Sequence, residues 1–193
     1  MKFESYTIVI SGLGGQGLIR LLQILGNALM REGYKVITSE THGLSQRGGK
    51  VTCFLRFGNK LNAPIPMTGT ADMIIALEES SILDVLKYTR PDKNTKLVIS
   101  TYEKKIIGKE YPSLNYLLDT LFEHSDYVYF IPVANIAKEI IKGPKTVNTI
   151  MLGYILRFLP IKKEKIERSL EEHFSKKKID MNLYAFREGY KLQ

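Results

Sequence analysis

Three glycines with the spacing Gly-x-Gly-x-x-Gly stand directly after a strand-like apolar run, and this feature constrains the fold more than any other. The run covers residues 6–10 and is rich in β-branched and aromatic side chains, and Gly12, Gly14 and Gly17 follow it. Over residues 18–29, leucine and alanine recur at helical spacing. A strand, a glycine turn and a helix in that order predict the start of a Rossmann-like layer.

Strand-like and helical segments alternate along the rest of the chain. The predicted strands are residues 35–38, 51–57, 71–77, 95–100 and 127–133. The predicted helices are residues 78–88, 116–124, 134–141, 148–159, 162–174 and 182–191. This alternation predicts an α/β fold: a three-layer, Rossmann-like arrangement with a mostly parallel sheet, helices on both faces and a helical C-terminal tail. No repeat or linker interrupts the pattern, so residues 1–193 are predicted to form a single domain.

Composition excludes several classes of protein. Hydrophobic residues make up 44% of the chain and charged residues 25%, which excludes wholesale disorder. The single cysteine, Cys53, excludes an intramolecular disulfide and a four-cysteine cluster within this chain. We therefore expect a partner or a dissociable cofactor to carry the electrons of any redox chemistry. No signal peptide or membrane-length apolar run is visible, so a cytoplasmic location without membrane contact is expected.

The glycine turn is suited to an anion. A turn without Cβ atoms exposes backbone N–H groups, and the positive end of the following helix attracts a negative charge, often a pyrophosphate. Glu40 ends the second predicted strand, about 20 residues beyond the turn, where dinucleotide-binding folds place a ribose-binding acid. Alternatively, the glycines only permit tight packing of helix on strand. Gln16 would either hydrogen-bond a ligand or cap the loop.

A second glycine-rich loop follows the second predicted strand. It contains His42, Ser45, Gln46, Arg47, Gly48 and Gly49. In a doubly wound parallel sheet this loop lies beside the glycine turn, at the edge where ligands bind. Arg47 would bind a phosphate or carboxylate, or pair with Glu40. A structural imidazole is the favoured interpretation of His42, and a small buried side chain that of Cys53.

Three segments together resemble a known family. They are residues 12–17 (GLGGQG), 39–49 (SETHGLSQRGG) and 148–153 (NTIMLG). In this order they resemble the gamma-type subunit of 2-oxoacid:ferredoxin oxidoreductases. The form S-E-x-H-G-x-x-Q-R-G-G is most similar to the small (beta) subunit of the indolepyruvate type.

The resemblance implies an enzyme that works only as a complex. Such enzymes decarboxylate a 2-oxoacid on thiamine diphosphate, pass electrons through iron–sulfur clusters to ferredoxin and release an acyl-CoA. In the indolepyruvate type, for which an aryl pyruvate is the expected substrate, thiamine diphosphate and the clusters lie on the large (alpha) subunit. This chain is therefore expected to bind no cofactor alone, to dock on that subunit and to be inactive by itself, with coenzyme A as cosubstrate.

The two glycine-rich loops provide the candidate site. We expect them to line a surface for the phosphates of coenzyme A or for the mouth of the partner's active site, without a catalytic residue or metal ligand of their own. The residues are Gly12, Gly14, Gly15, Gln16, Gly17, Ser45, Gln46, Arg47, Gly48 and Gly49. The alternative is a stand-alone NAD(P)- or flavin-binding Rossmann oxidoreductase. The net charge of +8 would also suit a nucleic-acid-binding module, but no basic motif interleaved with aromatic residues supports one.

Overall fold

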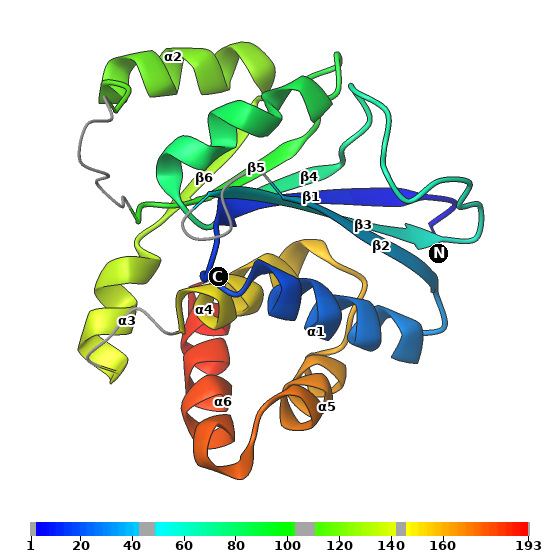
Figure 1. Cartoon of the computed structure of the whole chain (residues 1–193), viewed down its shortest axis with the longest axis vertical. Coiled ribbons are helices and arrows are strands. Elements are labelled where there is room, and N and C mark those ends of the chain that lie inside the picture. Colours follow the sequence, from blue (N-terminus) through cyan, green and yellow to red (C-terminus); the bar gives the residue numbers. More distant parts are fainter. Residues whose placement is uncertain (1–2, 43–48, 103–110, 142–145, 193) are drawn as a thin grey trace.

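The computed structural model describes residues 3–42, 49–102, 111–141 and 146–192, in which a central sheet lies between two layers of helices (Figure 1). Within these residues the sheet is six-stranded, in the order β2-β3-β1-β4-β5-β6. The strands are β1 (Tyr6–Leu13), β2 (Lys35–His42), β3 (Lys50–Gly58), β4 (Met73–Ala76), β5 (Lys96–Ser100) and β6 (Tyr127–Ile131). The alternation of elements in the sequence is thus confirmed.

The sheet is mostly parallel, as predicted, but the position of β2 differs from the prediction. β4 pairs parallel with β1, β5 with β4, and β6 with β5. β3 runs antiparallel to both β1 and β2 and lies between them. The prediction of β2 as the direct neighbour of β1 is therefore wrong. The connection from His42 to Lys50 is too short for a parallel crossover, which needs about a dozen residues or more, so β3 runs antiparallel to β2.

The helices form two layers on opposite faces of the sheet (Figure 1). One layer contains α1 (Leu18–Arg31), α3 (Val133–Ile141), α4 (Val147–Ile155), α5 (Lys163–His173) and α6 (Lys176–Lys191). The other contains η1 (Glu79–Tyr88) and α2 (Leu114–His124). The three-layer prediction is confirmed. The helix predicted at residues 78–88 is a 3₁₀-helix, and the last helix begins at Lys176 instead of 182.

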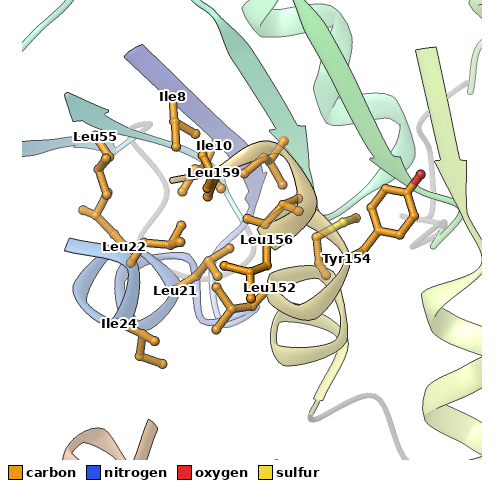
Figure 2. Close-up of a cluster of buried hydrophobic side chains, with 14 of the residues drawn as sticks. Ile8, Ile10, Leu21, Leu22, Ile24, Leu55, Leu152, Tyr154, Leu156 and Leu159 are labelled. Atoms are coloured by element: carbon orange, nitrogen blue, oxygen red, sulfur yellow. The ribbon is translucent and has the colours of Figure 1, made fainter. Parts of the chain in front are cut away.

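β1 is buried on both of its faces, which explains its continuous apolar sequence. Ile8 and Ile10 face the α1 and α4 side and belong to the same buried cluster as Leu21 and Leu152 (Figure 2). Val9 faces the layer of η1 and α2. The glycine turn therefore begins at the end of a fully buried strand.

The C-terminal helices are part of the core rather than an appendage. Every residue of α4 is buried, so this helix lies between the sheet and α6. α4 and α6 cross at Gly153 and Gly189. A Cβ atom on Gly153 would overlap the carbonyl oxygen of Phe186, and one on Gly189 would overlap that of Ile150. The backbones of the two helices are thus in direct contact, which only glycine permits at these positions.

Candidate functional site

The glycine turn joins the carboxyl end of β1 to the amino end of α1. Gly17 is the N-cap of α1 and has a φ angle of 80°, and Gly15 has a φ angle of 91°. Both values lie in the left-handed region that glycine adopts without strain. The first turn of α1 contains no acidic residue, and no side chain caps it. The first N–H groups of a helix have no partner within the helix, so this end of α1 remains positive.

Gln16 is a structural residue of the turn. Its Oε1 atom accepts a hydrogen bond from the Leu13 N–H at 2.6 Å, and its Nε2 atom donates to the Leu77 carbonyl at 3.2 Å. The side chain thus ties the turn to the end of the neighbouring strand β4. Of the two interpretations open from the sequence, the loop cap is the one the structure supports.

The glycines of the turn have different roles. A Cβ atom on Gly12 would lie 2.6 Å from the Oε1 atom of Gln16, so this glycine makes room for the glutamine. Around Gly15, in contrast, there is nothing within 4 Å of the Cβ position, and the residue is exposed. Gly12 therefore supports packing, whereas Gly15 presents bare backbone to whatever approaches the turn.

The second loop reaches the turn through its last residue. The N–H group of Gly14 donates to the carbonyl oxygen of Gly49 at 2.8 Å. The prediction that the two loops lie together is correct for Gly49. This residue directly precedes β3, which pairs with β1, whereas β2 does not pair with β1. Ser45, Gln46, Arg47 and Gly48 lie outside the described residues, so their part in the site stays a prediction.

The strand order does not favour a dinucleotide site at Glu40. In dinucleotide-binding folds the second strand lies next to the first, so that its terminal acid reaches the ribose of a nucleotide bound at the turn. Here β3 separates β2 from β1, and Glu40 lies opposite Cys53 in the β2–β3 pairing. The geometry therefore supports an anion at the turn better than a complete NAD site.

A buried polar cluster beneath the turn was missed in the sequence. Glu78, only 1% exposed, accepts hydrogen bonds from the Ser81 N–H and the Ser80 hydroxyl. The Ser81 hydroxyl lies 3.1 Å from that of Ser11, at the end of β1. The cluster fixes the carboxyl ends of β1 and β4 relative to each other. The sequence does contain an indication of this cluster, because polar residues directly after a buried strand lie at the edge of the sheet where ligands bind.

An open pocket of about 330 Å³ lies beside this cluster, between the start of η1 and α2. It is lined by Glu79, Ser80, Tyr111, Pro112, Leu114 and Leu117. Its volume falls at the lower end of the range of small-molecule sites.

Cys53 lies in the core, as expected. It is fully buried, and burial together with the negative charge of Glu40 raises the pKa of its thiol to about 12. The thiolate is the reactive form, so this cysteine is inert at neutral pH. Among the described residues, no group of three or more His, Cys, Asp or Glu side chains could hold a metal ion.

Cys53 should therefore be protected in the folded chain. With a pKa of about 12, only about one thiol in ten thousand is ionised at pH 8, and the side chain is also inaccessible. We expect no measurable reaction with a disulfide reagent at pH 8 and one rapid equivalent after unfolding in guanidinium. Equal rates in both states would contradict the burial of Cys53.

Comparison with known proteins shows the family. The sequence pattern of the family described as pyruvate ferredoxin/flavodoxin oxidoreductase matches residues 7–192. The chain belongs to this family. The indolepyruvate oxidoreductase subunit IorB of Archaeoglobus fulgidus is 33% identical to it over 95% of this chain and 92% of the relative. The resemblance noted in the glycine motifs is thereby confirmed.

Solved structures of the pyruvate ferredoxin/flavodoxin oxidoreductase family share the fold. Pyruvate oxidoreductase subunit PORC from Thermotoga maritima superimposes with a TM-score of 0.72 at 21% identity, covering 98% of this chain and 97% of that chain. The 2-oxoglutarate:ferredoxin oxidoreductase of Magnetococcus marinus gives a TM-score of 0.76 at 23% identity. The match covers 99% of this chain but only 31% of that one. The same fold thus occurs both in a chain of similar length and as part of a longer chain.

None of the helices in the described ranges is long and apolar enough to cross a lipid bilayer.

Proposed function

We propose that this chain is the small subunit of a 2-oxoacid:ferredoxin oxidoreductase of the indolepyruvate type. The complex would oxidatively decarboxylate an aryl pyruvate, form an acyl-CoA and reduce ferredoxin. The observation that carries the proposal is the 33% identity to IorB, which extends over nearly the full length of both proteins. A cytoplasmic location remains a prediction from the sequence.

The proposed division of labour assigns thiamine diphosphate and the iron–sulfur clusters to a large partner subunit. The composition of this chain supports that assignment, because its one cysteine is buried. A cluster held by four cysteines cannot be built from such a chain. The small subunit would then dock on its partner and present to it the edge of the sheet that carries the glycine turn.

The glycine turn is the part of that edge best suited to the anionic cosubstrate. Gly15 offers exposed backbone, and the first turn of α1 offers N–H groups without a competing carboxylate. The Magnetococcus relative was solved with coenzyme A and succinyl-CoA bound. We therefore assign Gly14, Gly15, Gly17 and Gly49, with the adjoining residues 45–48, to a surface for the phosphates of coenzyme A at the mouth of the partner's active site. Gln16 would contribute by holding the turn in shape.

Reconstitution tests the proposed function. Co-expressed with its large subunit under anaerobic conditions, the chain should support ferredoxin reduction that requires both coenzyme A and a 2-oxoacid. We expect kcat/KM for indolepyruvate to exceed that for pyruvate by about tenfold or more. The large subunit alone and the small subunit alone are the controls. Turnover by the isolated small subunit, or a complex inactive with every 2-oxoacid, would overturn the proposal.

A further inference from the structure

A residue far away in the sequence donates a hydrogen bond to the glycine turn. Asn148 lies in the first turn of α4, and its Nδ2 atom donates a hydrogen bond to the carbonyl oxygen of Gly17 at 3.3 Å. Because a carbonyl oxygen only accepts, this contact also fixes which end of the amide faces the turn. A Cβ atom on Gly17 would lie 2.5 Å from the same Nδ2 atom, so the two residues are in close contact.

The Gly17 carbonyl has a second partner within α1. The Leu21 N–H donates to it at 3.0 Å, which is the first hydrogen bond of the helix. One oxygen thus joins the helical ladder of α1 to the side chain of Asn148. The direction of this carbonyl sets the plane of the peptide between Gly17 and Leu18, and hence the direction of the Leu18 N–H.

Asn148 is itself held by buried polar groups. The Thr149 hydroxyl lies 2.9 Å from the Oδ1 atom of Asn182 in α6 and 3.3 Å from that of Asn148, and its single proton serves one of these two acceptors at a time. The Asn182 Nδ2 atom donates to the Lys178 carbonyl. Asn148 is 9% exposed, and Thr149 and Asn182 are 2% exposed. Buried polar groups of this kind are costly to move because each must keep its partners, so the position of Asn148 is well determined.

We propose that Asn148 is a positioning residue, which orients the N–H groups at the start of α1 toward an anionic group of coenzyme A. The inference rests on the proposed function of the turn. Asn148 does not touch the ligand: it acts through the Gly17 carbonyl, and it lies next to the buried hydrogen-bonded pair Thr149 and Asn182.

Two substitutions of Asn148 distinguish the effect of its hydrogen-bond donor from the effect of its side-chain shape. Asn148→Ala removes the amide, whereas Asn148→Asp keeps the shape but presents only acceptors to the Gly17 carbonyl. An aspartate in the first turn of α4 suits the positive end of that helix, so α4 itself is not weakened. Asn27→Ala is the matched control, because Asn27 is also an asparagine with side-chain hydrogen bonds, but near the other end of α1.

Two measurements on the variants test the inference. Hydrogen exchange of the amides of residues 14–19 in the folded chain reports on the turn without any ligand. In the reconstituted complex, the KM for coenzyme A is measured alongside kcat and the KM for the 2-oxoacid. Both Asn148 variants should exchange about fivefold faster at the turn and raise the KM for coenzyme A about five- to tenfold, while the other constants stay within about twofold. Asn27→Ala should change neither measurement.

The possible results distinguish a failure of the proposed role of Asn148 from a failure of the proposed function of the chain. Unchanged exchange at the turn would overturn the inference, as would faster exchange with an unchanged KM for coenzyme A. A wild-type complex without coenzyme A-dependent activity would overturn the proposed function instead. In that case the exchange experiment would still decide whether Asn148 orders the turn.

Discussion

Gly189→Ala is expected to lower the free energy of unfolding by about 3 kcal/mol or more. The added methyl group would overlap the Ile150 carbonyl, and α4 has no room to retreat because all of its residues are buried. For a chain of this size the loss corresponds to a melting temperature lower by about 6–12 °C. Gly153→Ala, on the other side of the same crossing, should behave similarly. Thermal and urea unfolding followed by circular dichroism measure both effects.

Gly26→Ala is the matched control for this prediction. Gly26 is also a helical glycine, but a Cβ atom there would lie 3.6 Å from Val36 and 3.8 Å from Thr38, which are ordinary contacts. Alanine favours helix over glycine by about 1 kcal/mol, so this variant should be as stable as the parent or more so. Similar stabilities for Gly189→Ala and Gly26→Ala would show that the two helices do not touch at their backbones.

Ile19→Glu is expected to raise the KM for coenzyme A in the complex by about tenfold or more. Ile19 lies in the first turn of α1 and is 41% exposed, so the substitution costs little burial. A carboxylate at this end of a helix stabilises the helix by about 0.3–1 kcal/mol, but it repels a phosphate bound there. The variant should therefore weaken the binding of coenzyme A without lowering the stability of the folded chain. Added salt should shrink the effect, because an exposed charge is screened.

Ile19→Gln is the control for Ile19→Glu, because it is polar and of similar length but uncharged. It should leave the KM for coenzyme A within about twofold of the parent. A Glu variant indistinguishable from the Gln variant at low salt would show that no anion binds at this end of α1. Removing Gln16 would be a poorer test, since its side chain holds the turn together.

Local patterns in the sequence predicted the elements but not their arrangement. The apolar run of β1 and the glycines after it were sufficient to locate the strand, the turn and the start of α1. The place of β3 between β1 and β2 was missed because a parallel sheet was assumed. The seven residues between His42 and Lys50 are too few for a crossover, so the antiparallel direction of β3 could have been inferred from this length, whereas its place beside β1 could not.

The sequence predicted those parts of the candidate site that depend on backbone conformation, but not those that depend on side-chain contacts. The glycine pattern directly after a strand was sufficient to assign Gly12, Gly15 and Gly17 to a turn in advance. The direction of the Gln16 side chain depends on the carbonyl of Leu77, a residue directly after strand β4 and 61 positions away in the sequence. The role of Asn148 depends on Gly17, 131 positions away in the sequence. Contacts of that range follow from tertiary packing, which no local pattern encodes.

The connection from the glycine turn through α4 to α6 has a consequence for how the protein is made. The turn leaves the ribosome well before Asn148, which donates a hydrogen bond to it, and before Asn182, which accepts a hydrogen bond from the neighbouring Thr149. A nascent or truncated chain that lacks the last helix would have an α1 whose start is not yet fixed. The glycine turn therefore acquires its final shape only after residues 148 and 182 have been synthesised.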